Sequence, residues 1–150
     1  MAGSGSTIDE LSSSTRVKVT RLNEIVDQFL TADKIVVVNP VWNFLFPPVL
    51  KAYIDAICIA GKTVKYTPEG IIGLATDKKL LNIQASGSVL SEGQSAGFEF
   101  SHSYLTAICK FIGISSIEFI YIEGTGAAPD KVATIKERAT QQALELAKRF

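Results

Sequence analysis

The sequence predicts an α/β domain built on a parallel sheet with helices on both faces. Strand-like and helix-like segments alternate along the chain, which is the order expected when parallel strands are joined by crossover helices. Residues 35–38, Ile-Val-Val-Val, form an apolar β-branched run without alternation. Such a run is typical of a strand covered on both faces, as strands in parallel sheets are.

Four helices are expected. Between Val17 and Leu30, apolar residues recur at intervals of three and four, as an amphipathic helix requires. Pro47 and Pro48 suit the first turn of a second helix that runs to about Ala60. A third helix is expected from about residue 98 or 101 to 111, and a fourth opens at Pro129. The apolar face expected for the fourth helix consists of Val132, Ile135, Ala139, Leu144 and Leu146.

Three sheet strands are expected, at 35–38, 79–84 and 117–122. A short hairpin or flap is expected around residues 63–70, and the polar, glycine-bearing segment 89–97 predicts a mobile excursion. In a parallel sheet, ligands bind beyond the carboxyl ends of the strands. The loops that follow the three strands are therefore the candidate functional loops.

Charge and composition exclude several classes of function. Fifteen basic and fifteen acidic residues cancel, so no overall field attracts nucleic acid or an anionic membrane surface. The most apolar stretch, 105–122, is interrupted by charged residues and a glycine, which argues against a membrane span. Cys58 and Cys109 lack the spacing of a zinc or redox motif and fit a reducing, cytoplasmic environment. For the single histidine, His102, we expect a solvated or capping role, and Lys78 and Lys79 are expected on a solvated face.

The loop at 39–44 is the most informative candidate. Asn39 precedes a proline and is therefore expected to leave the strand in an extended conformation. Backbone amides in the turn and the Asn43 side chain can donate hydrogen bonds to a flat ligand, while Trp42 and Phe44 can form apolar walls. The alternative is a strand-to-helix turn whose aromatic residues cap the core. The position at the end of a strand favours the functional interpretation.

Two further loops are weaker candidates. In the loop at 85–88, Gly87 permits close approach of the backbone to a ligand, and Ser86 and Ser88 carry hydroxyls; an ordinary turn would look the same. The segment 123–126 can close the far side of a site or serve as a simple turn into a helix. Tyr66 is either a hairpin aromatic or part of a covering flap.

Several of these motifs together resemble the FMN-dependent NADH azoreductases, a family that includes NAD(P)H:quinone oxidoreductases. The similarity runs from about Val17 to the C-terminus. The matching segments are Pro40-Val-Trp-Asn-Phe44, Leu50-Lys-Ala-Tyr-Ile-Asp55, Ala60-Gly-Lys-Thr63, Lys78-Lys79, Phe111-Ile-Gly113 and Glu123-Gly124.

The resemblance implies a flavodoxin-like, homodimeric enzyme. It would use NAD(P)H to reduce FMN and then reduce quinones or azo compounds in two-electron, ping-pong steps. Because the flavin carries the hydride chemistry, no side chain is expected to be catalytic. Tyr66 and Phe111 match positions that line the substrate pocket. The residues implied to contact FMN are Pro40, Val41, Trp42, Asn43, Phe44, Ala85, Ser86, Gly87 and Ser88.

The sequence also departs from the family pattern. Relatives usually carry an arginine and a second glycine where this chain has Ser86 and Ser88. Residues 1–16, expected to be a flexible or artificially added lead-in to a domain at 17–150, show no counterpart of the family's first strand and phosphate-binding loop. We therefore expect an N-terminally truncated version of the fold.

This truncation has two expected consequences. The strand at 35–38 would have an exposed edge that favours association with another chain, and FMN would be held weakly. The alternative function is a non-catalytic fragment or assembly module that does not retain FMN. Acyl carrier protein phosphodiesterase activity, also attached to this family, ranks last because no metal ligands cluster in the sequence.

Overall fold

The structure is a computed structural model that describes residues 11–150. Its three-stranded sheet has the order β1-β4-β5 and is parallel throughout, and a separate antiparallel hairpin joins β2 to β3. The helices and strands, including two short 3-10 helices, are α1 (Ser13–Thr31), β1 (Lys34–Pro40), α2 (Pro48–Ile57), β2 (Val64–Thr67), β3 (Gly70–Gly73), β4 (Lys79–Ala85), η2 (Gly93–Phe98), α3 (Phe100–Ile112), β5 (Ser116–Ile122), η3 (Pro129–Lys131) and α4 (Val132–Ala147).

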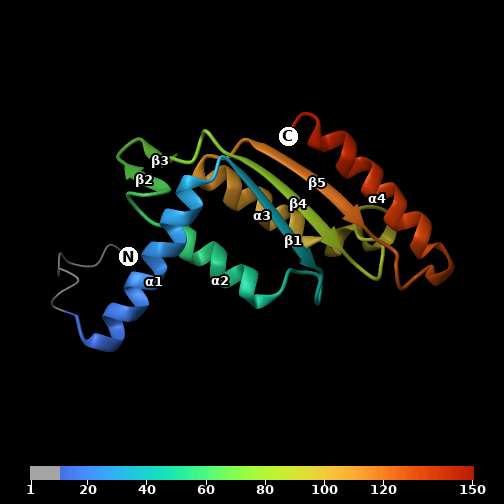
Figure 1. The fold of residues 1–150 in the computed structure, drawn as a ribbon, viewed down its shortest axis with the longest axis horizontal. Helices are drawn as coiled ribbons and strands as arrows, with labels where there is room; N and C mark the ends of the chain where they lie inside the picture. Colours follow the sequence, from blue (N-terminus) through green and yellow to red (C-terminus); the bar gives the residue numbers. More distant parts are fainter. Residues whose placement is uncertain (1–10) are drawn as a thin grey trace.

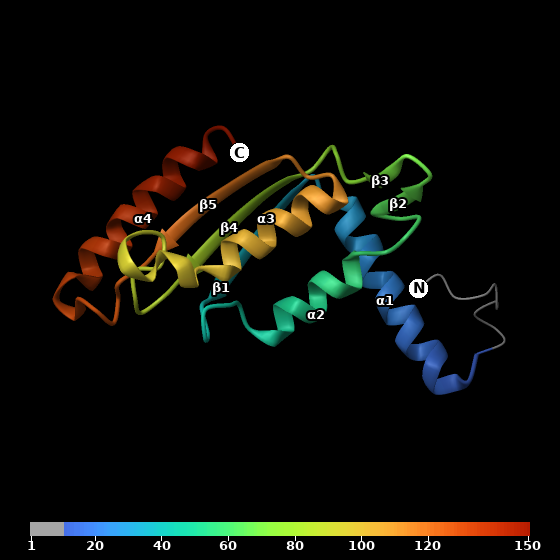
Figure 2. The same ribbon diagram turned by 180° about the vertical axis from the view of Figure 1, so that it is seen from behind.

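Helices cover both faces of the sheet, as the sequence predicts (Figures 1 and 2). On one face, Phe29 of α1 and Ile112 of α3 pack with Leu80 of β4 in the main core. On the other face, Ala139 and Leu146 of α4 pack against β4 and β5 in a second core. The sheet is thus the central layer of a three-layer α/β arrangement.

Strand β1 is less covered than its sequence predicts. Val36 is 54% exposed and Val38 is 71% exposed, whereas Ile35 and Val37 pack toward the main core. The core that α4 forms is built on β4 and β5, and β1 lies at the edge of the sheet. The expectation that this strand is covered on both faces is therefore wrong within the described chain, while the expected open edge is confirmed.

The first helix begins earlier than predicted. It starts at Ser13 rather than near Val17, because the hydroxyl of Ser12 accepts a hydrogen bond from the amide of Thr15 at 3.3 Å and caps the helix. The first buried residue of α1 is Val26, so its first three turns lie largely in solvent. Residues 1–10 of the expected lead-in lie outside the described part.

Two helices differ from prediction at individual positions. Helix α2 ends at Ile57 instead of about residue 60, and the following chain turns through Gly61 in a left-handed conformation. In α4, Leu144 is 54% exposed, so its assignment to the apolar face is wrong. Ala139 and Leu146 are buried as expected.

The predicted flap is the β2–β3 hairpin, and it is anchored to the C-terminal end of α3. A Cβ atom on Gly73 would lie 2.2 Å from the amide nitrogen of Gly113, so two backbones cross there without room for a side chain. The amide of Ala75 then donates to the carbonyl of Ile112 at 2.8 Å.

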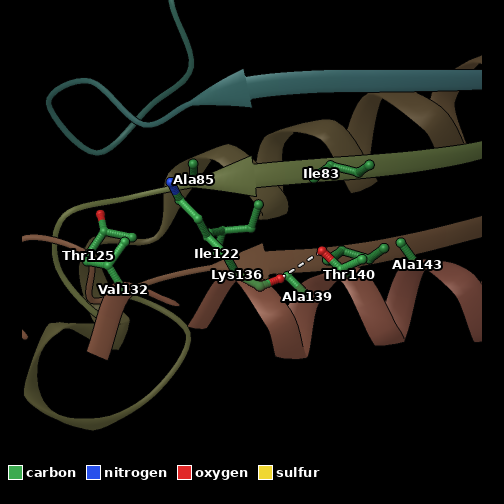
Figure 3. Close-up of a pocket in the computed structure, with 10 residues that line it drawn as sticks. Ile83, Ala85, Ile122, Thr125, Val132, Lys136, Ala139, Thr140 and Ala143 are labelled. Atoms are coloured by element: carbon green, nitrogen blue, oxygen red, sulfur yellow. Dashed lines mark hydrogen bonds between the residues drawn. The ribbon is translucent and has the colours of Figure 1, made fainter. Parts of the chain in front are cut away.

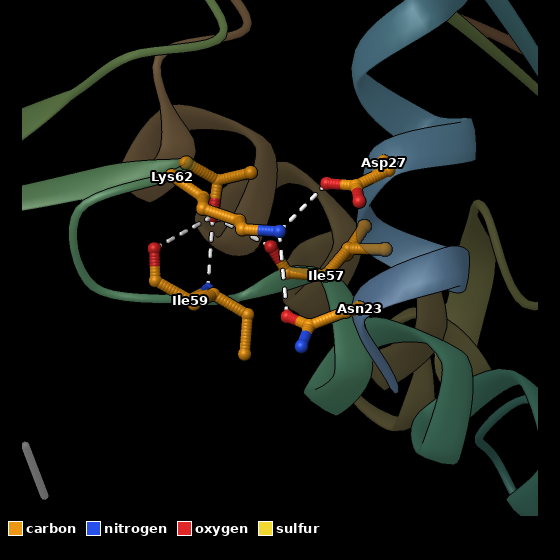
Figure 4. Close-up of polar contacts among 6 residues, drawn as sticks. Asn23, Asp27, Ile57, Ile59 and Lys62 are labelled. Carbon is orange, nitrogen blue, oxygen red and sulfur yellow. Dashed lines mark hydrogen bonds and ion pairs between the residues drawn. The ribbon is translucent and has the colours of Figure 1, made fainter. Parts of the chain in front are cut away.

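Polar contacts join the approach to this hairpin with α1 and α2 (Figure 4). The amine of Lys62 lies 2.6 Å from the carboxylate of Asp27 and also donates to Asn23. The buried hydroxyl of Thr63 donates to the carbonyl of Ile57 at 2.5 Å. The hairpin thus has a fixed base, whereas Tyr66 and Ile71 on its strands are largely exposed.

Lys78 is buried, contrary to the solvated position expected for it. Its side chain is 3% exposed, and the amine donates to the carbonyl oxygens of Leu30 and Ala32 at 2.8 and 2.9 Å. These carbonyls end α1, where a positive charge is favourable. Within residues 11–150, no helix is both long enough and apolar enough to cross a membrane.

Candidate functional site

The loop after β1 forms a tight turn with an uncommon backbone. Trp42 and Leu45 exchange two backbone hydrogen bonds, at 2.7 and 3.1 Å, and the two residues between them have positive φ angles, 50° for Asn43 and 69° for Phe44. Two consecutive left-handed residues are typical of a type I′ turn, and this conformation is unfavourable for phenylalanine. Such local strain is common at functional sites.

The loop after β4 lies beside this turn. The amide of Val41 donates to the carbonyl of Ala85 at 2.8 Å, which joins the two loops. The hydroxyl of Ser86 donates to the carbonyl of Ser88 at 2.6 Å, and Ser86 is only 7% exposed. This hydroxyl therefore shapes its own loop and does not present a free donor to a ligand.

A pocket with a cavity volume of about 240 Å³ lies between the two loops. Its position at the carboxyl ends of neighbouring parallel strands is the usual ligand position in such sheets. The residues that line it are Val41, Asn43, Phe44, Ser86, Gly87, Ser88 and Leu90.

The pocket residues offer several unpaired hydrogen-bond donors. Within the described chain, the backbone N–H groups of Asn43, Phe44, Gly87 and Ser88 have no hydrogen-bond partner, and neither does the Asn43 side-chain amide. The carbonyls of residues 86–88, in contrast, accept hydrogen bonds from within the protein. A ligand with acceptor atoms along one edge would satisfy these donors.

Six of the nine residues predicted to bind a cofactor line this pocket, and three do not. Pro40 is the last residue of β1, Trp42 is 60% exposed outside the pocket, and Ala85 lines a different groove. Leu90 lines the pocket at 3% exposure but was not predicted. Its apolar side chain within a polar, glycine-bearing segment was the available signal.

The residues just after the segment 89–97, which is expected to be a mobile excursion, pack on the first loop. The 3-10 helix η2 ends at Phe98, whose ring stacks on the Phe44 ring with centroids 5.0 Å apart. The amide of Phe100 also donates to the carbonyl of Phe44 at 3.3 Å. These contacts help to hold Phe44 in its left-handed conformation.

Tyr66 and Phe111, the predicted substrate-pocket residues, lie at the other end of the sheet. Tyr66 is on the hairpin, and Phe111 is near the end of α3, where the chain returns to start β5. Figure 1 shows the hairpin beyond the amino ends of the sheet strands, opposite the loops that form the pocket. The structure does not bring these two residues to the pocket of the same chain.

His102 is half-buried, and its ring contacts β5 rather than capping a helix. Its ring packs on Phe119 with centroids 3.8 Å apart, and its Nδ1 is hydrogen-bonded to the hydroxyl of Tyr121. Burial, with smaller contributions from Glu99 and Glu123, raises the pKa of Tyr121 to about 12. The histidine therefore belongs to the packing between α3 and β5.

The carboxylate of Glu99 joins β4 to α3. Glu99 caps α3 by accepting from the amide of His102 at 3.0 Å, and it also accepts from the buried side chain of Gln84 at 2.9 Å.

Elsewhere in the core, burial raises the pKa of the Cys109 thiol to about 12, so this cysteine is a poor nucleophile at neutral pH.

A second cavity, of about 740 Å³, is an apolar groove between the sheet and α4 (Figure 3). Ile83 and Ile122 line it from the sheet, and Ala139 and Ala143 line it from the helix. The Thr140 hydroxyl, which also lines the groove, donates a hydrogen bond to the backbone carbonyl of Lys136 at 2.9 Å within α4. Few polar groups converge there, so the smaller pocket between the loops is the better candidate for a functional site.

Comparison with known proteins agrees with this fold. A family model described as flavodoxin-like fold matches residues 4–147. The FMN-dependent NADH:quinone oxidoreductase 3 of Halalkalibacterium halodurans is 55% identical over 142 residues, which cover 95% of this chain and 67% of the relative. The chain belongs to this flavodoxin-like oxidoreductase family. The FMN-dependent NADH:quinone oxidoreductase of Geobacillus kaustophilus is 52% identical over 147 residues, which cover 98% of this chain and 70% of the relative.

Solved structures of the family have the same fold. The azoreductase AzrA superposes with a TM-score of 0.90 at 39% identity, over 99% of this chain and 70% of AzrA. An FMN-dependent NADH-azoreductase from Bacillus anthracis, solved in complex with FMN, superposes with a TM-score of 0.81 at 34% identity, over 92% of this chain and 67% of that one.

Proposed function

We propose that this chain is an FMN-dependent oxidoreductase that uses NADH to reduce quinones or azo compounds. Relatives at 50 to 56% identity carry the name FMN-dependent NADH:quinone oxidoreductase, and the structural neighbours at 34 to 40% identity are azoreductases. When bound, FMN supplies the redox chemistry, accepting a hydride equivalent from NADH and passing two electrons to the acceptor. The role of the chain is to hold and orient the ring.

The observation that supports this proposal is the set of unpartnered donors in the pocket. The edge of an isoalloxazine ring that carries two carbonyl oxygens and ring nitrogens donates one hydrogen bond from its N3–H group and accepts several from donors of the protein. The backbone N–H groups of Asn43, Phe44, Gly87 and Ser88 and the Asn43 side chain are donors of this kind. Donors fixed in this way also favour added electron density on the atoms that they contact.

Apolar residues complete the fit to a flat ring. Val41, Phe44 and Leu90 line the same pocket and exclude water from a ring face. The residues that would hold FMN are thus the two loops at 41–44 and 86–90. This set retains most of the residues predicted from the sequence and adds Leu90.

The acting form, we propose, is a homodimer. Tyr66 lies at the opposite end of the sheet from the pocket of its own chain, so it can contact a bound acceptor only in a second copy. The hairpin surface is suited to this contact, because Tyr66 is 63% exposed and its cross-strand neighbour Ile71 is 56% exposed. Sedimentation of the Tyr66→Lys variant as a monomer, with the original chain sedimenting as a dimer, would support this assembly.

The cytoplasm is the compartment we propose. Both Cys58 and Cys109 are free thiols. Unpaired cysteines in a core are common where the surroundings are reducing.

The proposed function is tested by adding FMN to the purified chain and following flavin fluorescence, and then by measuring NADH oxidation with benzoquinone as acceptor. We expect saturable FMN binding and quinone-dependent NADH oxidation. A chain that binds no FMN and oxidises no NADH would contradict the proposal.

The Asn43→Gly variant tests the assigned pocket. Glycine accepts the left-handed backbone at this position but removes one side-chain donor. We expect FMN affinity to fall about two- to tenfold, which is the usual effect of one lost hydrogen bond, with unfolding free energy unchanged or slightly higher. Unchanged FMN affinity would place the ring elsewhere.

A further inference from the structure

The loop after β5 does not line the pocket, yet it contacts the loop that does. Residues 123–127 are absent from the pocket lining. Their amides nevertheless bond to the carbonyls of the loop after β4: those of Gly126 and Ala127 both donate to Gly87 at 2.9 Å. Thr125 donates to the carbonyl of Ser86 through its hydroxyl at 3.1 Å. This arrangement occupies the carbonyls of residues 86 and 87, while the N–H groups of Gly87 and Ser88 have no partner among residues 11–150.

The two loops also approach closely at a pair of glycines. A Cβ atom on Gly126 would lie 3.3 Å from both the Cα atom and the carbonyl oxygen of Gly87. This separation is at the tight end of contacts that real side chains make. The backbone of the loop after β5 therefore packs directly against Gly87 and holds it by hydrogen bonds.

Glu123 makes the most extensive of these contacts. Its Oε1 atom accepts from the amides of Leu90 and Ser91 at 3.1 and 3.0 Å. Its Oε2 atom accepts from the hydroxyl of Ser91 at 2.5 Å. Hydrogen bonds to a carboxylate are stronger than those between neutral groups, so this side chain determines where the segment 90–91 lies.

This segment matters because Leu90 is a pocket wall. The Leu90 side chain is 3% exposed, and its amide is one of the two that Glu123 holds. If the carboxylate were absent, the amides of Leu90 and Ser91 would lose their partners and the wall would be free to move. Among residues 11–150, Glu123 is the only hydrogen-bond partner that these two amides have.

We propose that Glu123 is a positioning residue, which holds the backbone of Leu90 and Ser91 so that the loop at 86–91 keeps the shape that receives the flavin ring. The proposal rests on the function proposed above. It assigns to Glu123 a role without contact to the cofactor, exerted through the neighbouring loop.

The test compares Glu123→Leu with Glu123→Gln, which keeps one acceptor oxygen. Amide hydrogen exchange is measured by NMR on the chain without flavin, and FMN affinity is measured by fluorescence titration. For Glu123→Leu we expect exchange at Leu90 and Ser91 to accelerate at least about tenfold and FMN affinity to fall about tenfold. For Glu123→Gln both changes should be smaller.

Glu92→Leu is the matched control. Glu92 is exposed, lies in the same segment, and its carboxylate has no hydrogen-bond or ion-pair partner within residues 11–150. This variant loses the same charge but should leave exchange and FMN affinity within about twofold of the original chain. If Glu123→Leu fails to fold, Glu123→Gln and Ser91→Ala replace it, because Ser91→Ala removes one of the donors to Glu123.

The outcomes separate this inference from the proposed function. Unchanged exchange at Leu90 and Ser91 would overturn the positioning role, and so would faster exchange with unchanged FMN affinity. If the original chain binds no FMN, the proposed function fails, while the exchange measurement still decides whether Glu123 holds the loop. If Glu92→Leu lost as much FMN affinity as Glu123→Leu, the effect would come from the lost negative charge and not from the position of the loop. That result would overturn the inference.

Discussion

Lys78 donates a hydrogen bond from its buried amine to the carbonyl oxygen of Leu30, at 2.8 Å, across 48 positions of sequence. A second bond to Ala32, at 2.9 Å, completes the end of α1. We expect Lys78→Met to lower the free energy of unfolding by about 1–3 kcal/mol, because two partly buried carbonyls lose a charged donor. Urea denaturation followed by circular dichroism measures this loss.

Lys79→Met is the control for this prediction. The Lys79 amine is exposed and makes a long contact of 3.4 Å with the carbonyl of Arg149. The change in unfolding free energy should be within about 0.5 kcal/mol. Equal losses in the two variants would show that the buried contacts of Lys78 contribute little.

The crossing of Gly73 and Gly113 predicts a large effect from a single methyl group. Gly73→Ala would place a Cβ atom 2.2 Å from the amide nitrogen of Gly113, so one backbone must shift. We expect a loss of about 1–3 kcal/mol in unfolding free energy. Gly97→Ala is the matched control, because a Cβ atom there has no heavy atom within 4 Å. A Gly73→Ala variant as stable as Gly97→Ala would contradict the crossing.

Stability should depend on the ionisation of Tyr121 at high pH. Its pKa is raised to about 12 from 10.0, mainly by burial, with Glu99 and Glu123 adding to the effect. The unfolded chain therefore loses this proton before the folded chain does, and stability falls as pH rises from about 10 toward 12. Below pH 10 the phenol is protonated in both states and this contribution does not change.

Tyr121→Phe should remove that part of the pH dependence. We expect the unfolding free energy of this variant to fall less steeply above pH 10 than that of the original chain, as measured by urea denaturation from pH 8 to 11. Tyr66→Phe, at a 63% exposed site on the hairpin, is the control. Parallel curves for Tyr121→Phe and the original chain would contradict the prediction.

The open edge of β1 predicts association. Among residues 11–150, β1 pairs only with β4, and Val36 and Val38 are exposed beside this edge. Unpaired strand edges with apolar side chains favour pairing with other chains. We expect Val38→Lys to reduce species larger than the dimer in multi-angle light scattering. Val49→Lys, at a 76% exposed position on α2, should not. Absence of such species in the original chain would remove the basis of this prediction.

The layer order and the position of the pocket between the two loops could be predicted from the sequence. Both follow from local patterns: the β-branched run at 35–38 defines a sheet strand, and alternation with helices defines a parallel sheet. The position of the pocket then follows from the ends of the strands. The predicted loop at 39–44 contributes Val41, Asn43 and Phe44 to that pocket.

Contacts between distant segments could not be predicted in the same way. Lys78 resembles any surface lysine until α1 brings two carbonyls to its amine. Likewise, the apolar side chains of Val36 and Val38 indicate a strand face that can be buried. Residue type alone does not reveal whether another segment covers that face, and both side chains are exposed. The left-handed conformation of Asn43 and Phe44 could not be predicted either, since neither residue is a glycine. Packing of Phe44 on the distant Phe98 helps to hold this conformation.

Helix α1 divides into two parts of unequal local stability. Its first three turns bury no side chain, whereas the end of the helix is held by the buried Val26 and Phe29 and by the bonds to Lys78. A helix segment of that length is marginal in water without tertiary contacts. Proteases should therefore cut between Ser13 and Leu22 while the sheet remains folded, and the buried end of the helix would stay with the domain.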